Sequence, residues 1–176
     1  MDKPLEITLH VPNIQELLRA PGARYRKRTL NRDAENFIIE ESEMISRKGE
    51  IKIIIRLAAS GTQYKDDIPP AVHQQFSYRR QQAQIKLKHT LHFGWMNLFI
   101  AFGLLGVVFS LIQLGTNFIA DNQLMKVISE SFIILAWVAL WRPMELLLYD
   151  WYPIKRDIDL FRRLEESIVQ VIIDEA

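Results

Sequence analysis

The sequence predicts a membrane α-helical hairpin of two transmembrane helices plus a small cytoplasmic α/β (α+β) domain built from both chain ends. The hairpin is predicted by residues 93–114, which carry no formal charge, and by a second apolar run at 127–149. A helix as long as the first run spans about 33 Å, close to the ~30 Å hydrocarbon core of a bilayer. The domain is predicted by strand-like alternation of apolar residues near each end of the chain.

Two spans of about twenty residues leave room in 176 residues for one small soluble domain and no more. We therefore expect six segments along the chain. They are a cytoplasmic strand-helix-strand part at 1–69, an amphipathic helix at 70–92 leading into the membrane, the first span at 93–114, a short external loop at 115–126, the second span at 127–149, and a cytoplasmic tail at 150–176 whose helix and strand complete the soluble domain.

Three segments show the alternation of a strand with one buried face. Apolar residues alternate with polar ones at 5–11, again at 51–57, and more weakly at 168–173. Between the first two strands, 32–48 reads as a helix with Asn31 as its cap. The helix is predicted to bury one stripe of side chains: Ala34, Phe37, Ile38, Met44 and Ile45.

A single long helix is predicted from Pro70 to Gln113, because prolines suit a helix start and no breaker follows until Gly94. Glycine is tolerated inside membrane helices. The outer half of this helix has an apolar stripe that includes Phe76 and Leu87. We expect this stripe to be covered by the domain, by a neighbouring subunit or by lipid headgroups.

The distribution of basic residues predicts the topology. Of 22 Lys and Arg residues, 16 precede the first span, only Lys126 lies between the spans, and five follow within the second span and the tail. By the positive-inside rule, both termini of this multi-pass protein are expected in the cytoplasm. The chain has no cysteine, which excludes disulfides, thiolate catalysis and Cys-ligated metal sites.

Small residues mark the faces on which membrane helices approach each other. The predicted helix-packing residues lie on one face of each span: Gly103, Gly106 and Ser110 on the first, and Ser129, Ala136 and Ala139 on the second. In an antiparallel hairpin, facing residues have a constant sum of numbers. Pairing Gly103 with Ala139, Gly106 with Ala136 and Ser110 with Ser131 gives sums of 242, 242 and 241, which brings the two small faces together in one register. The same register sets Asn97 opposite Glu145 and Gln113 near Glu130.

Arg142 and Glu145 lie on neighbouring positions of the second span, with Pro143 between them. With Asn97, Glu130 and Gln113 they form a predicted membrane polar cluster. Ionisable residues in a membrane often line an ion path, but a shallow pair at the interface costs little, and the sequence favours the shallow pair. The aromatic residues of the same region fit an interfacial belt: Trp141, Tyr149, Trp151 and Tyr152.

The run from Trp141 to Pro153 resembles the signature W-R-P-x-E-x-x-x-Y-D-W-x-P of an uncharacterised family of bacterial two-transmembrane-helix membrane proteins. The layout of the chain is similar as well, including an H-x-x-F-x-Y-R segment at 73–79. The resemblance implies a location in the bacterial inner (plasma) membrane. It assigns no catalytic role to any residue.

Other candidate sites carry weaker signals. His89 and His92 share a helix face, yet no acidic residue lies within ten positions to complete a metal site. The basic run at 23–28 suits anionic lipid at least as well as nucleic acid. No phosphate loop, HExxH or GxSxG motif is present, so we expect neither enzymatic activity nor a cofactor.

These observations predict a non-enzymatic oligomeric scaffold or interaction module of the inner membrane. Its expected partners are the lipid bilayer, further copies of the chain and another membrane protein, with no nucleic acid. The alternative is a small oligomeric ion channel or transporter whose polar path contains Asn97, Glu130, Arg142 and Glu145.

Overall fold

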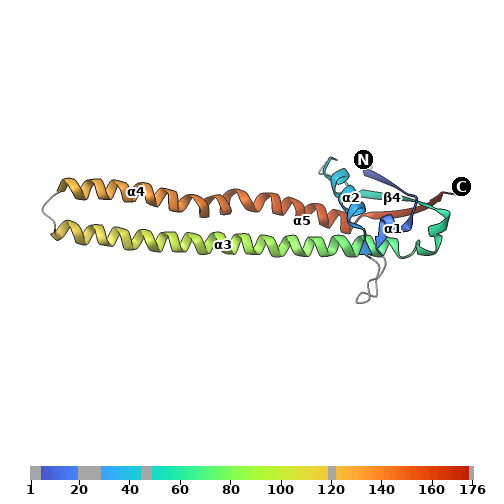
Figure 1. Ribbon diagram of the computed structural model, residues 1–176, viewed down its shortest axis with the longest axis horizontal. Coiled ribbons are helices and arrows are strands. Elements are labelled where there is room, and N and C mark those ends of the chain that lie inside the picture. Colours follow the sequence, from blue (N-terminus) through green and yellow to red (C-terminus); the bar gives the residue numbers. More distant parts are fainter. Residues whose placement is uncertain (1–4, 20–28, 45–48, 119–121, 175–176) are drawn as a thin grey trace. The chain divides into compact units, whose positions relative to one another are not determined.

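The computed structural model describes residues 5–19, 29–44, 49–118 and 122–174, and these residues form two compact units (Figure 1). The first unit comprises Met1–Ala83 with Arg156–Ala176 and contains the sheet. The second is the continuous segment Gln84–Lys155 and contains the apolar stretches of two long helices. The chain is therefore mostly helical, with a small sheet built from its two ends.

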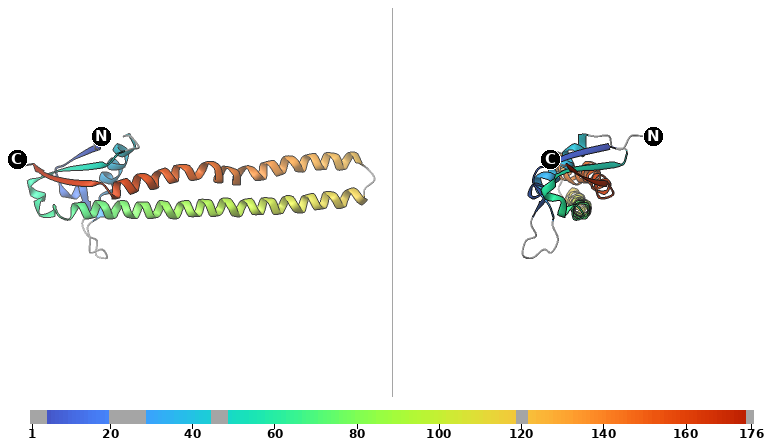
Figure 2. Two further views of the ribbon diagram at one scale, coloured as in Figure 1. Left: turned by 180° about the vertical axis from the view of Figure 1, so that it is seen from behind. Right: turned by 90° about the vertical axis from the view of Figure 1, so that its right-hand side faces the viewer.

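The sheet of the first unit has three parallel strands in the order β1-β4-β5. They are β1 (Leu5–Val11), β4 (Ile51–Ala58) and β5 (Ile168–Asp174). These strands correspond to the three alternating segments, and β5 brings the end of the chain beside β4 (Figure 2). A parallel sheet requires crossover connections, and the β1–β4 crossover contains α2 (Arg32–Met44).

One face of the sheet carries the core of the unit. The inward side chains of β4, Ile51, Ile53, Ile55 and Leu57, are at most 1% exposed. The other face of the same strand carries Lys52 and Arg56, which form ion pairs with side chains of β1 and β5. The alternation in the sequence thus separates a buried face from a polar one.

Helix α3 (Ile68–Phe118) is one continuous helix that begins close to Pro70, as predicted, and extends beyond the predicted Gln113. Its first turns pack on the sheet, and Ile68, Val72 and Phe76 are completely buried there. The domain therefore covers the N-terminal part of the apolar stripe of this helix, which includes Phe76. Before it, residues 59–64 form a 3₁₀ helix, η1 (Ala59–Tyr64).

Helix α2 buries only part of the predicted stripe: Ile38 is completely buried, and Ala34 packs partly buried against the core. Glu35, Ile38 and Ser42 are its buried residues, whereas Phe37 is 42% and Met44 78% exposed. The expectation for Phe37 and Met44 was wrong because the helix turns the Glu35 carboxylate inward, where α3 supplies hydrogen-bond donors. Ile45 lies outside the described residues.

A short segment that the sequence did not predict precedes α2. Helix α1 (Ile14–Leu17) is capped by Asn13, whose side chain accepts a hydrogen bond from the Gln15 backbone. Strands β2 (Leu18–Arg19) and β3 (Thr29–Leu30) then pair antiparallel. Burial of Leu17, Leu18 and Leu30 fixes this segment to the core. The basic run at 23–28 lies outside the described residues.

The second apolar stretch is helical throughout, but its hydrogen-bond pattern changes along it. Helix α4 (Asn122–Glu145) passes into a π-helical segment, η2 (Leu146–Asp150), and then into α5 (Trp151–Glu165). Pro143 and Pro153 flank η2, and each lacks the N–H that a regular α-helix uses. A local π segment is a common way for a helix to accommodate such an interruption.

Candidate functional site

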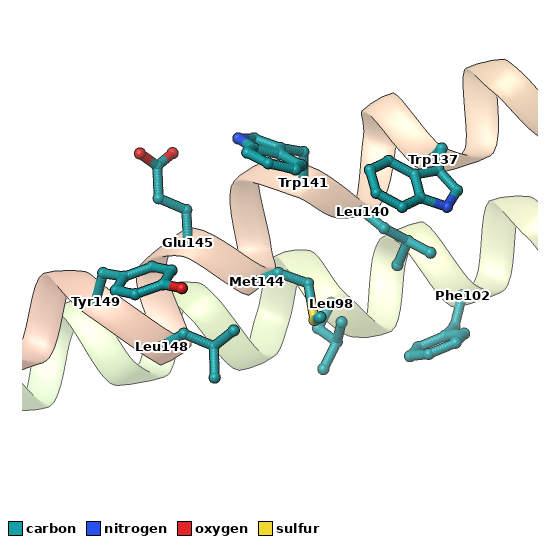
Figure 3. Close-up of a pocket in the computed structure, with 9 residues that line it drawn as sticks. All are labelled: Leu98, Phe102, Trp137, Leu140, Trp141, Met144, Glu145, Leu148 and Tyr149. Atoms are coloured by element: carbon teal, nitrogen blue, oxygen red, sulfur yellow. The ribbon is translucent and has the colours of Figure 1, made fainter.

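The most distinctive feature of the helical unit is an apolar groove of about 510 Å³ formed by α3, α4 and η2 (Figure 3). Helix α3 contributes Leu98 and Phe102. The other wall consists of two rows of side chains at four-residue spacing. The inner row is Leu140, Met144 and Leu148, and the outer row is Trp137, Trp141, Glu145 and Tyr149.

Four-residue spacing explains the outer row, because side chains four apart lie over one another on a helix. The rings of Trp137 and Trp141 are 5.9 Å apart and tilted at 33°. Glu145 follows with Tyr149 beyond it, and Figure 3 shows its carboxylate pointing away from α3. The groove thus has an apolar floor, aromatic walls and one carboxylate at its mouth.

Two ion pairs of Arg142, one of them with Glu145, lie at one end of the groove. An Arg142 Nη1 donates a hydrogen bond of 2.8 Å to a Glu145 carboxylate oxygen, and the same nitrogen is 3.9 Å from Asp150. One guanidinium therefore faces two carboxylates. All three side chains are at least 39% exposed, so they remain accessible. The sequence indicated the Arg142–Glu145 pair by its three-residue spacing but did not indicate Asp150.

The remaining polar residues of the predicted cluster do not join these ion pairs. Asn97 is partly buried, and within the described residues no hydrogen bond joins it to Glu145. Gln113 and Glu130 are both exposed. Because the structure pairs Glu145 with Arg142 on its own helix, the predicted Asn97–Glu145 partnership is corrected.

The predicted contact between small faces is only half present. A Cβ atom built on Gly103 or Gly106 meets nothing within 4 Å, and Ser110 is exposed with its hydroxyl bonded to the Gly106 carbonyl. Small residues of α4 do lose part of their exposure, namely Ser129, Ala136 and Ala139. The prediction was therefore wrong for the face on α3.

Helical geometry explains this difference. Ala101 is only 6% exposed, and a position two residues later lies about 200° further round the helix. Gly103 consequently points away from the buried side of α3. The close approach occurs instead at Gly94, where a Cβ atom would lie 2.8 Å from Leu147. The sum of these two numbers is 241, so the predicted register holds although the predicted face does not.

The predicted interfacial aromatic residues are largely exposed. Trp141, Tyr149 and Tyr152 are 57–70% exposed, and Trp151 packs edge-on against Tyr152. The Lys155 ammonium lies 5.6 Å from the centre of the Trp151 ring, within the range of a cation–π interaction. These residues therefore present aromatic faces and one cation at the same end of the unit as Glu145.

A second polar cluster, in the sheet-containing unit, was missed from the sequence. The Glu35 carboxylate is 3% exposed and accepts hydrogen bonds from Arg79 and Gln75 of α3. The hydrogen bond to Glu35 raises the pKa of Arg79 above its ordinary value. The sequence signal for this cluster is that Glu35, Ile38 and Ser42 share one face of α2. Two of the three residues are polar, so this face does not appear as an apolar stripe.

The H-x-x-F-x-Y-R segment supplies further contacts within this unit. His73 Nε2 lies 3.0 Å from the Ser167 carbonyl oxygen, where α5 turns into β5. Phe76 is completely buried, and Arg79 pairs with Glu35. Three residues of the motif therefore connect the start of α3 to β5, to the core and to α2. Within the described part of the chain, no cluster of His, Asp or Glu is placed to hold a metal ion.

Comparisons with known proteins add no relationship to this picture. No family model, curated protein or solved structure matches the chain.

Proposed function

We propose that this chain is an integral protein of the bacterial inner membrane and works as a non-enzymatic, oligomeric scaffold or interaction module. Its two helices would cross the bilayer with both termini in the cytoplasm, where the small parallel-sheet domain would meet its partners. The resemblance of residues 141–153 to a two-span bacterial family agrees with this location.

The exposure of the helical unit carries the proposal. Among the described residues, two helices are long and apolar enough to cross a membrane, and only 6% of the most apolar window of either is buried. Large contiguous apolar surfaces are rare on soluble monomers and mark contacts with lipid or protein. A lipid environment accounts for exposed side chains such as Phe99 and Val138, each 69% exposed.

Two observations support an interaction role over an enzymatic one. Polar side chains of the sheet unit such as Glu35, Arg79 and His73 have partners within the unit and connect its helices and strands. The open face at Gly103 and Gly106 offers a surface for a second copy, because membrane helices associate through close approach at small residues.

The channel alternative receives less support. Arg142 pairs with Glu145 on its own helix, and Glu130 lies twelve residues from Arg142, about 18 Å along a helix. This arrangement agrees better with an interfacial ion pair. Ion flux into liposomes that Glu145→Ala abolishes would instead favour the channel.

Two measurements on the full chain test the proposed function. We expect the protein to stay in the membrane pellet after an alkaline carbonate wash, and native mass spectrometry from detergent to show a complex of more than one chain. Release by carbonate would contradict membrane insertion. A species of one chain under all detergent conditions would contradict the oligomer.

A further inference from the structure

The groove between Leu98 and Tyr149 has the chemistry of a binding site for a particular class of lipid. This inference rests on the membrane insertion proposed above and goes beyond it, because insertion alone requires only nonspecific lipid contact. The groove has a volume of about 510 Å³, which falls within the range of about 300–1,000 Å³ found for small-molecule sites.

The length of the groove suits one leaflet of a bilayer. The outer row runs from Trp137 to Tyr149, and these twelve residues cover about 18 Å at about 1.5 Å each. Half of a ~30 Å hydrocarbon core is about 15 Å. An acyl chain lying along Leu140, Met144 and Phe102 would therefore extend from the headgroup level towards the bilayer centre.

The polar end of the groove lies near the start of the uncharged run, close to the headgroup level of the proposed bilayer. The uncharged run begins at Phe93, and Leu98 lies five residues further, about 7 Å along the helix. Glu145 lines the groove at about the level of Leu98. Tyr149 lines it one helical turn further along, towards Trp151 and Lys155. Polar and apolar parts of the groove thus follow the order of polar and apolar parts in a phospholipid.

The charges at this end select between headgroups. Arg142 and Asp150 lie beside the groove lining, and Arg142 is 2.8 Å from Glu145 and 3.9 Å from Asp150, so this ionic contact joins one cation to two carboxylates. A headgroup with only a phosphate charge would add a third negative group to the Arg142 contact. A zwitterionic headgroup matches both signs, with its phosphate at Arg142 and its ammonium at a carboxylate.

The aromatic neighbours of Glu145 fit an ammonium as well. Trp141 precedes it by four residues and Tyr149 follows it by four, and both residues are more than 60% exposed (Figure 3). A carboxylate flanked by aromatic faces binds ammonium groups through charge and cation–π attraction together. The neighbouring Trp137 extends this wall into the apolar part of the groove.

We propose that this groove binds one phospholipid with a zwitterionic headgroup. Arg142 binds the phosphate, Glu145 binds the ammonium between Trp141 and Tyr149, and one acyl chain occupies the apolar floor. The bound lipid covers the apolar floor of the groove.

The test uses the full chain in detergent with an equimolar mixture of phosphatidylethanolamine and phosphatidylglycerol that carry identical acyl chains. Native mass spectrometry then measures how much of each lipid stays bound. We expect retention of one phosphatidylethanolamine per chain in preference to phosphatidylglycerol. Glu145→Gln should lower this preference roughly ten-fold, the size of one lost charge-assisted contact.

Matched variants make the result specific to the groove. Glu130→Gln removes a carboxylate of the same helix that does not line the groove, and it should leave the preference unchanged. Leu140→Trp fills the floor and should lower retention of both lipids. Circular dichroism of each variant establishes that the helices are intact.

Several outcomes would overturn the proposal. Equal retention of both lipids, or equal effects of the Glu145 and Glu130 variants, would show that the headgroup is not recognised here. A second chain bound with no retained lipid would assign the groove to an oligomer interface. If carbonate-washed membranes keep the protein but no lipid preference exists, only this inference fails; if the wash releases the protein, the proposed function fails with it.

Discussion

Arg79 of α3 donates a hydrogen bond to the buried carboxylate of Glu35 on α2, across forty-four residues of sequence. Gln75 of α3 bonds to the second oxygen of the same carboxylate at 3.0 Å. A carboxylate that is 3% exposed is costly unless it is paired and hydrogen-bonded. This contact therefore fixes which face of α2 packs against the first turns of α3.

Removal of Arg79 should destabilise the sheet unit more than its partial exposure suggests. Arg79→Ala leaves the Glu35 charge buried without its cation, and we expect a loss of about 3 kcal/mol in the free energy of unfolding. Glu43→Gln, at an exposed position of α2, should change stability by less than about 0.5 kcal/mol. Denaturant unfolding followed by circular dichroism measures both values.

The pH dependence of this contact follows from the direction of the pKa shift. Folding raises the pKa of Arg79, so its contribution is complete below the unfolded pKa and is lost only as the pH rises through the folded pKa. Both values are strongly alkaline. The Arg79→Ala loss should therefore be the same at pH 6 and pH 9, and a marked difference between these conditions would contradict the assignment.

The C-terminal segment should be essential to the sheet unit, because Leu164 of α5 is completely buried in its core. Leu164→Ala creates a cavity there, and we expect it to cost about 2–5 kcal/mol of stability. Ile168→Ala is the matched control, since Ile168 is 57% exposed on the edge strand β5. Similar unfolding midpoints for the two variants would show that the C-terminal segment is a separate element.

His73 should contribute through its contact with the chain at the start of β5. His73→Leu removes the partner of the Ser167 carbonyl oxygen, 3.0 Å away, and should lower stability by about 1 kcal/mol. His89→Leu alters an exposed histidine of the same helix and should have little effect. Thermal unfolding of the two variants compares them directly, and a larger loss for His89 would exclude this role.

The sequence revealed the elements whose side chains repeat with one period. The alternation at 51–57 gave β4, and the long breaker-free run gave α3. It did not reveal α1 or the β2–β3 pair, because four- and two-residue elements are too short to show periodicity. Glu35 was missed for a different reason: its burial depends on Arg79 and Gln75, which lie far away in sequence.

The groove was half visible in the sequence. Trp141, Glu145 and Tyr149 were recognised as interfacial residues, and their four-residue spacing could have shown that they form one row. Their apolar opposite wall at Leu98 and Phe102 could not be identified, since it depends on which face of α3 turns towards α4. Small residues suggested the face of Gly103, whereas the buried side carries Ala101.

Labelling of single cysteines should establish the topology, because the chain has none of its own. With a membrane-impermeant maleimide on intact cells, we expect Lys126→Cys to react and Gln63→Cys and Glu166→Cys to react only after lysis. All three positions are exposed, so accessibility in the fold does not limit the reaction. Labelling of position 63 or 166 from outside intact cells would contradict the prediction that both termini lie in the cytoplasm.

The three glycines Gly94, Gly103 and Gly106 should respond differently to enlargement. A Cβ atom at Gly94 would lie 2.8 Å from Cδ2 and 3.0 Å from Cγ of Leu147, so Gly94→Val overpacks the contact within one chain. We expect this variant to lower the thermal stability of the hairpin by about 1–3 kcal/mol. Gly103 and Gly106 have open space around them, so leucine at either position should leave the hairpin intact.

The same contrast tests the oligomer, because leucine at Gly103 or Gly106 would block close approach by another helix. We expect Gly103→Leu and Gly106→Leu to reduce the fraction of oligomer in native mass spectrometry without changing the unfolding temperature of the remaining monomer. Leu104→Ala, an exposed neighbour that becomes smaller, controls for general surface changes. An unchanged oligomer in both glycine variants would place the contact on another face, since no helix could then be packed against these two positions.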